Sequence, residues 1–152
     1  RQWYGNSPTL LAELRGDKAA RAISGIERVV PDYPFPDRYG IWPGPNSNTF
    51  IAWVVRQVPE LSVDFPPNAI GKNYLPEEFV ARTPTQTGYQ LSLGGLFGVM
   101  LAWDEGFELD VLGLTVGVDW QSPALKLPGI GRVGMAQPTG SHGEREVEQE
   151  IP

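Results

Sequence analysis

Three apolar runs in the second half of the chain constrain the fold more than any other feature. They are separated by turn residues, two glycines in one case and Asp-Glu-Gly in the other, and such turns join neighbouring antiparallel strands. Two further glycines, Gly113 and Gly117, lie inside the longest run and predict a bend that divides it into two strands. We therefore predict an antiparallel meander. The runs span residues 88–93, 96–103 and 107–120, and residues 124–127 are the candidate for an additional edge strand.

The same part of the chain is rich in carboxylates and has no basic residue between residues 83 and 123. Two carboxylates at a suitable separation could hydrolyse a glycoside, and several together could hold a hard cation. However, Glu108 and Asp110 alternate with apolar neighbours, which is typical of the solvent-facing side of a half-buried strand. We favour that interpretation and predict that these side chains face solvent. The five carboxylates are Asp104, Glu105, Glu108, Asp110 and Asp119.

The first half of the chain has helical patterns instead. A short helix is predicted over residues 10–14. A second helix, with Asp17 as its cap, is predicted up to Val30, because apolar residues recur there at spacings of three and four. A third helix, over residues 50–57, is apolar almost all round, so we expect it to be buried, together with Trp53 within it.

These patterns predict an α+β fold, in which two or three N-terminal helices pack on a C-terminal antiparallel sheet of three to five strands. A length of 152 residues with 41% apolar residues suits one domain with a single core. We assign residues 1–135 to this globular domain and residues 136–152 to a disordered acidic tail, because the tail shows no periodicity and carries a run of charges.

Charge and composition exclude several classes of function. The formal net charge is −6, of which the last ten residues contribute −3 through four Glu and one Arg, and the basic residues form no cluster. Nucleic acid is therefore not an expected partner. With no Cys and one His, neither a metal site nor a cofactor is expected. No apolar run approaches the ~20 residues that span a bilayer, so we expect the chain to be soluble as given.

A Pro- and Gly-rich turn, residues 42–46, leads into the third predicted helix and is the candidate functional site. Ser47 lies at the start of this helix, where free N–H groups and the helix dipole would stabilise a nucleophile or an oxyanion. The competing interpretation is structural, because Asn and Ser at such positions usually cap the helix. A serine nucleophile also needs a base, and the sequence offers only His142, Lys72 and Lys126.

Three stretches of the first half form a specific set of motifs: residues 42–50 (WPGPNSNTF), residues 58–61 (VPEL) and residues 66–72 (PPNAIGK). They resemble a bacterial family catalogued as domain of unknown function 3750, and the resemblance runs from about residue 3 to residue 134. Members of that family carry an upstream segment with a membrane anchor or signal. The resemblance therefore implies a protein of the bacterial cell envelope or periplasm, with membrane association through a segment that is absent from this chain.

The family is in turn distantly similar to permuted papain-like proteins, which include lecithin retinol acyltransferase and relatives of cell-wall peptidases. This similarity implies a papain-like fold and a hydrolase or acyltransferase, with Ser47 as the catalytic nucleophile at a position normally occupied by Cys. A non-catalytic binding or interaction module of the cell envelope is the alternative. The ligand in either case would be a small molecule, a lipid or a peptide. The expected binding residues are Asn46, Asn48, Thr49, Trp42 and Lys72.

Overall fold

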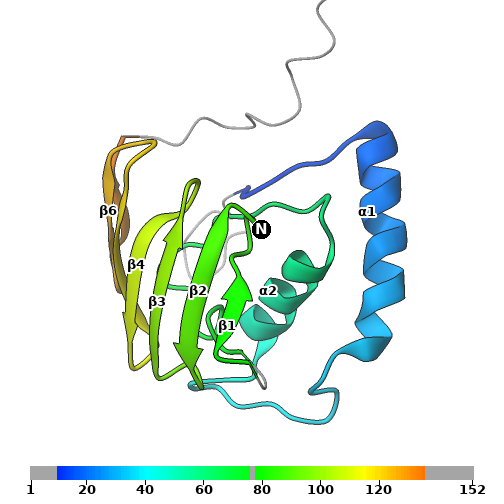
Figure 1. Cartoon of the computed structure of the whole chain (residues 1–152), viewed down its shortest axis with the longest axis horizontal. Helices are drawn as coiled ribbons and strands as arrows, with labels where there is room; N and C mark the ends of the chain where they lie inside the picture. The colour runs from blue at the N-terminus through cyan, green and yellow to red at the C-terminus, as the bar shows by residue number, and fades with distance from the viewer. Residues whose placement is uncertain (1–9, 76–77, 136–152) are drawn as a thin grey trace, which may run out of the picture.

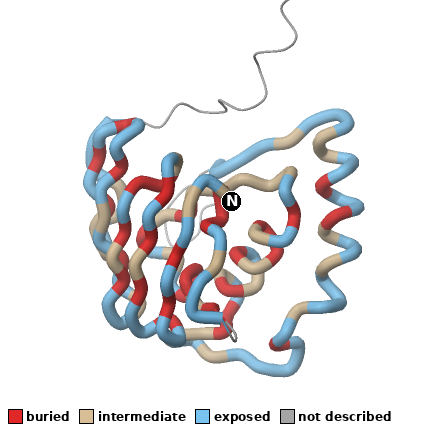
Figure 2. The backbone as a smooth tube through the Cα atoms, viewed as in Figure 1, coloured by how far each residue is buried: buried red, intermediate tan, exposed pale blue. Residues whose placement is uncertain are grey.

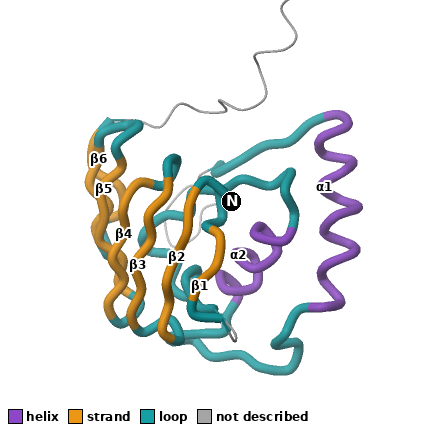
Figure 3. The backbone as a smooth tube through the Cα atoms, viewed as in Figure 1, coloured by secondary structure: helices purple, strands orange, loops and turns teal. Residues whose placement is uncertain are grey.

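The computed structural model describes residues 10–75 and 78–135, and within these ranges it contains two α-helices and one sheet. The elements form successive layers (Figures 1 and 3). The sheet lies on one side, α2 (Ser47–Gln57) lies beside its inner face, and α1 (Gly16–Val29) lies farthest from the sheet and contacts α2. A short 3₁₀ helix, η1 (Val30–Asp32), follows α1 directly.

The sheet has seven strands in the order of the chain, and every neighbouring pair is antiparallel. A meander of this kind needs only short turns, because each strand returns beside the one before it. The bend predicted within residues 107–120 is confirmed, since Leu112 and Gly113 turn with positive φ angles of 54° and 77° between two strands. The strands are β1 (Val80–Arg82), β2 (Gly88–Leu93), β3 (Phe97–Ala102), β4 (Gly106–Val111), β5 (Leu114–Asp119), β6 (Ala124–Leu127) and β7 (Gly131–Gly134).

The predicted sheet of three to five strands is wrong, because β1 and β7 add one strand at each edge. Each is too short, at three and four residues, to show an alternating pattern, and β7 begins and ends with glycine. The short helix predicted over residues 10–14 is also absent, since the described residues before Gly16 are not helical. The predicted packing of the helices on the sheet is also wrong: α1 contacts α2, and α2 reaches the sheet through Arg56, whose guanidinium donates to the Gln90 side chain of β2 at 2.8 Å.

The two faces of the sheet are reversed relative to the expectation from the sequence. Glu108 is fully buried and Asp110 is 3% exposed, whereas Phe107 and Val111 on the same strand face solvent. Figure 2 shows this alternation of buried and exposed positions along the strands. The period of two is as predicted, but its phase is opposite, so the polar side chains point inward.

The apolar core therefore lies away from the outer side of the sheet. One cluster of buried residues is formed by Ala22 of α1 with Val54 and Val58, and a second joins Ala52 and Val55 of α2 to Phe65. The expectation that α2 is buried all round is only partly correct. Ile51 is exposed and Trp53 is half-buried, packing against the first cluster and against the Tyr33 ring at 5.5 Å.

Candidate functional site

The turn before α2 places Asn46, and not Ser47, in the capping position. The Asn46 side-chain oxygen accepts the backbone N–H groups of Asn48 at 2.9 Å and Thr49 at 3.2 Å. The Thr49 hydroxyl in turn accepts the Asn46 backbone N–H at 3.1 Å, which completes a capping box. Two of the free N–H groups expected to attract an anion at this helix start are therefore already satisfied.

The same residues tie the turn to the segment that follows α2. The Asn46 side-chain amide donates to the Ile70 carbonyl at 3.0 Å, and the Asn48 amide donates to the same carbonyl at 2.9 Å. The Thr49 hydroxyl donates to the Gly71 carbonyl at 2.9 Å. Three of the five predicted binding residues are thus brought together, and the bonds they make join two loops of the fold.

The other two predicted binding residues lie elsewhere. Trp42 donates its indole N–H to the Leu112 carbonyl at 2.8 Å and so joins the turn to one end of the sheet. Lys72 points in another direction, into a buried ionic cluster under the inner face of the sheet. The structure therefore does not bring Ser47, Trp42 and Lys72 together as one site.

Ser47 itself is exposed at the first turn of α2 and lies on an open groove with a volume of about 480 Å³. Within the part of the chain that the structure describes, its hydroxyl has no hydrogen-bond partner. The groove contains an acid and a guanidinium, Asp37 and Arg38, but neither Lys72 nor Lys126, and His142 lies outside the described residues. The groove is lined by Tyr33, Phe35, Pro36, Asp37, Arg38, Tyr39, Asn46, Ser47 and Phe50.

The ionic cluster under the sheet is centred on Glu108, which binds two ammonium groups. Lys72 Nζ lies 2.7 Å from one carboxylate oxygen and Lys126 Nζ lies 2.7 Å from the other. Lys126, which lies in β6, also contacts Asp64 at 2.9 Å. Two cations and two anions balance, which is the condition under which charges tolerate burial.

Backbone carbonyls complete the coordination of the two lysines. Lys72 Nζ donates to the Phe65 carbonyl at 3.1 Å, and Lys126 Nζ donates to the Glu105 carbonyl at 2.8 Å. Burial alone would lower the pKa of Lys126, but the charges of Glu108 and Asp64 outweigh it, so that this pKa is raised. The cluster therefore holds Lys126 as a cation, which makes it unsuitable as a base.

Glu105 is a buried carboxyl beside this cluster. Its carboxylate accepts the hydroxyl and the backbone N–H of Thr85, the latter at 3.3 Å. Burial raises the pKa of Glu105 to about 7, although hydrogen bonds from Thr85 and Thr83 oppose the shift. The residue is only 1% exposed, so its carboxyl is closed off from solvent in the described structure.

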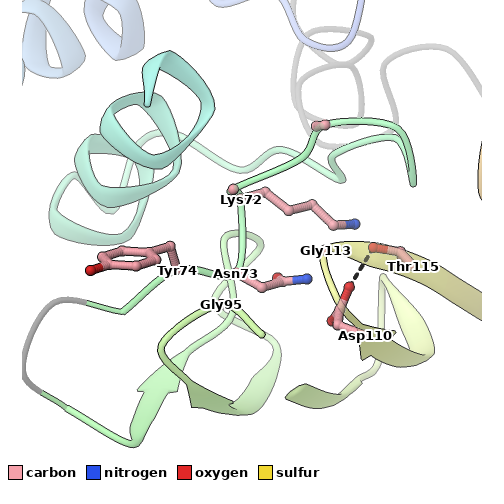
Figure 4. A pocket seen from close by; sticks show the side chains of 9 residues that line it. Lys72, Asn73, Tyr74, Gly95, Asp110, Gly113 and Thr115 are labelled. Atoms are coloured by element: carbon pink, nitrogen blue, oxygen red, sulfur yellow. Dashed lines mark hydrogen bonds between the residues drawn. The ribbon is translucent and has the colours of Figure 1, made fainter. Parts of the chain in front are cut away.

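A small pocket lies between the segment after α2 and the ends of β4 and β5 next to the turn that joins these two strands (Figure 4). Burial raises the pKa of Asp110 there, and hydrogen bonds from Thr115 and Asn73 oppose that shift. The Asn73 side-chain oxygen is buried and lacks a partner among the described residues. The space is about 10 Å³, which admits a single water molecule and no organic ligand.

The outer face of the sheet is the largest feature that the sequence interpretation missed. Its side chains form three rows across the strands, and Arg82 is the single charged residue within those rows. The apolar residues that form this face alternate along the strands in the sequence. They are recognised as a surface only when the apolar side of the strands is assigned to solvent and the polar side to the interior. The exposed apolar members are Val80, Tyr89, Leu91, Leu93, Phe97, Leu101, Phe107, Val111, Leu114, Val116, Val118, Leu125 and Val133.

Two further properties concern metals and membranes. Within residues 10–75 and 78–135, no group of three or more His, Cys, Asp or Glu side chains is placed to hold a metal ion. Over those same residues, neither helix has the length and apolar character required to cross a bilayer.

Comparison with known proteins identifies one family. The model of the family described as "Protein of unknown function (DUF3750)" matches residues 1–74, which include α1, α2 and the turn between them. This match supports the resemblance noted in the sequence over the first half of the chain, and the seven-stranded sheet lies outside it. No curated protein and no solved structure matches the chain.

Proposed function

We propose that this chain is a non-catalytic interaction module of the bacterial cell envelope, and that it docks on a lipid surface through the outer face of its sheet. The observation that carries the proposal is the reversed sheet, with charged side chains inside and apolar side chains outside. The match to the family over residues 1–74 supports the assignment to the envelope, because the resemblance implies members that carry an upstream membrane anchor or signal.

The size of the apolar face favours a docking role. Thirteen large apolar side chains, each more than a third exposed, present on the order of 1,000 Å² of apolar surface. The largest apolar patch on a typical monomer is roughly 300–600 Å². Removing apolar surface from water is favourable by about 25 cal/mol per Å². A face of this size therefore gains free energy when a partner covers it.

The distribution of charge favours lipid as the occupant over a charged macromolecule. The face has Arg82 at one edge as its charged group, and most of the acidic side chains of the sheet lie on the inner side. The apolar surface also continues from the face onto one end of the sheet, where Leu112 and Ile130 are exposed. A second copy stacked on the face would cover the rows and leave this end in water, whereas acyl chains can surround both.

The test is flotation with vesicles of phosphatidylcholine. Because the attraction is apolar, the chain should float with the vesicles at 0.1 M and at 0.5 M salt alike. Leu101→Thr should reduce the bound fraction, since it removes an apolar side chain from the centre of the face while keeping a strand-favouring residue. Ile23→Thr is the matched control, because Ile23 is equally exposed but lies on α1, so its binding should be unchanged.

Two results would overturn the proposal. One is a failure of the folded wild-type chain to float with vesicles of any zwitterionic composition. The other is a stable dimer in solution, seen by light scattering, that dissociates in the Leu101→Thr variant and does not bind lipid.

A second function, a hydrolase or acyltransferase, is favoured by one observation: the Ser47 hydroxyl is exposed on a groove at the helix start and is not used as a cap. A serine in that place needs a base, which an upstream segment or the residues beyond 135 would have to supply. Fluorophosphonate labelling of the full-length protein tests this function. Labelling that Ser47→Ala abolishes supports it, and absence of labelling across several acyl and phosphonate probes excludes it.

A further inference from the structure

The groove beside Ser47 is lined by aromatic rings that belong to a larger cluster. The Tyr33 ring meets Phe50 edge-on with centroids 5.0 Å apart, and it meets Trp53 at 5.5 Å. Phe35, which is buried, lies 5.9 Å from Tyr33 and 5.8 Å from Tyr74. Each ring is thus held by at least one other ring. This wall of the groove is formed before any ligand binds, and a preformed site loses little conformational freedom on binding.

Tyr39 presents an open aromatic ring to the same groove. It is 73% exposed, and its ring contacts no other aromatic ring within the described part of the chain. The loop that follows it is closed on itself, because the Gly40 backbone N–H donates to the Pro45 carbonyl at 2.7 Å. The Asn46 side-chain amide also donates to the Ile41 carbonyl at 3.2 Å. The ring of Tyr39 therefore stands beside a fixed loop and is available to a ligand.

Two charged side chains of one turn border this groove. The turn is closed by the Arg38 backbone N–H, which donates to the Phe35 carbonyl at 3.4 Å, and the Arg38 guanidinium lies over the Phe35 ring, 5.2 Å from its centroid. Within residues 10–75 and 78–135, no ion pair and no side-chain hydrogen bond involves Arg38 or Asp37. A donor and an acceptor are therefore available next to each other at the edge of an aromatic groove.

This combination of groups favours a sugar as the ligand. A sugar hydroxyl both donates and accepts, so neighbouring hydroxyls can satisfy the acceptor Asp37 and the donor Arg38 together. One face of a pyranose ring carries C–H groups, which pack well on the negative face of an aromatic ring such as that of Tyr39. The exposed Ser47 hydroxyl, which also lines the groove, adds a further polar group.

Charge and size narrow the class to neutral oligosaccharides. The chain has a formal net charge of −6, and Asp37 balances Arg38 within the groove, so an anion gains no net attraction. Ion pairs in an open groove are screened by water and contribute little. The volume of about 480 Å³ falls within the roughly 300–1,000 Å³ of typical ligand sites and suits a short oligosaccharide.

We propose that this groove binds a neutral oligosaccharide, with one sugar ring on Tyr39 and the hydroxyls of that ring on Asp37 and Arg38. The site is separate from the outer face of the sheet, because the groove is formed by α2 and the segment before it, and α2 lies on the inner side of the sheet (Figure 1). The inference therefore goes beyond lipid docking and does not depend on it. It also requires no reaction at Ser47.

Isothermal titration calorimetry of the folded chain with cellotetraose, chitotetraose and maltotetraose tests the proposal. At least one of these sugars should bind, with the same affinity at roughly 0.1 M and roughly 0.5 M salt, because a neutral ligand forms no ion pair. Tyr39→Ala should weaken binding about tenfold through loss of the stacked ring, whereas Tyr39→Phe should leave it within about twofold. Phe79→Ala is the matched control and should bind like the wild-type chain, because Phe79 is 68% exposed but lies outside the groove.

Two further variants test the polar contacts. Asp37→Asn and Arg38→Gln should each weaken binding about threefold to tenfold, because each replaces a charged hydrogen-bonding group with a neutral one. Both side chains are exposed, as is Tyr39, so all of these variants should keep the melting temperature of the wild-type chain. Weaker binding at an unchanged melting temperature separates loss of the ligand contact from loss of the fold.

Three results would overturn the inference. One is the failure of all three sugars to bind the folded wild-type chain. Another is binding that Tyr39→Ala and Phe79→Ala weaken equally, which would place the sugar elsewhere on the protein. The third is tighter binding of tetragalacturonate, an acidic sugar, than of any neutral one, which would make Arg38 the centre of an anion site. None of these measurements involves vesicles, so the lipid docking of the outer face stands or fails separately.

Discussion

The inner and the outer face of the sheet obey opposite rules, although each strand contributes alternately to both. On the inner face a row across the strands contains Gln90, Glu108 and Lys126, and on the outer face the adjacent row contains Leu101, Phe107 and Leu125. In most half-buried sheets the apolar row would be inside. A buried face can therefore be polar when its charges are paired, and the apolar face then needs another partner.

Removal of the central charge of the inner face should break this arrangement most severely. Glu108→Gln should cost roughly 3–5 kcal/mol, because it leaves Lys72 and Lys126 buried without a carboxylate. Urea unfolding followed by circular dichroism measures the change. Val111→Thr on the exposed side of the same strand is the control and should cost less than about 0.5 kcal/mol. Equal costs would show that the two faces do not differ energetically.

The pH dependence of stability should reflect the inner face of the sheet, because the carboxyls with shifted pKa values lie on that side. The pKa of Glu105 is raised from 4.5 to about 7 by burial, so the folded protein holds a proton that the unfolded chain has lost. The stabilisation is complete below pH 4.5 and is lost as pH rises through 7, a decrease of about 3 kcal/mol at most. Burial also raises the pKa of Asp64 and Asp110, which act in the same direction.

Denaturation at a series of pH values between 5 and 8 measures this loss. Glu105→Gln should flatten most of the slope, since an amide does not titrate. The pKa of Asp119 is lowered instead, because hydrogen bonds and charge from Arg132 outweigh its burial, so its stabilisation is lost only in acid, below about pH 4, and does not affect this series. A stability that increases between pH 5 and pH 8 in the wild-type chain would contradict the assignment of Glu105.

The turn before α2 contains the same contrast between a buried and an exposed polar group. Asn46→Ala should cost about 0.5–2 kcal/mol, because the helix loses its cap. Ser47→Ala, one residue later, should change the free energy of unfolding by less than about 0.5 kcal/mol, since the hydroxyl is exposed. Urea unfolding measures both changes. A larger effect of Ser47→Ala than of Asn46→Ala would show that Asn46 is not the residue that caps the helix.

The smallest change in stability is expected on the outer face. Leu101→Thr should alter the free energy of unfolding by less than about 0.5 kcal/mol, because the side chain is exposed and Thr suits a strand. The same variant should lower vesicle binding clearly. A variant that lost stability and binding together would indicate that the outer face is covered within the folded chain.

Much of the fold follows from local patterns. The hairpin turns at residues 94–95 and 104–106, the bend at Gly113 and the helix start near Asn46 each depend on residues adjacent in the sequence. Such features can be predicted because glycine conformations and capping side chains act over a few residues. The single-residue choice between Asn46 and Ser47 as the cap could not be made, because both residue types serve that role.

Patterns in the sequence predict the period of the strands, their turns and a helix over residues 50–57, which the structure extends back to Ser47. The tertiary structure alone decided which face of the sheet is buried, and with it the roles of Glu108, Lys72 and the outer rows. The physical reason is that a period of two places side chains on two faces without saying which face is covered. The covering segment brings Lys72 and Asp64 from more than thirty residues away along the chain, and their charges make the polar side the inner one.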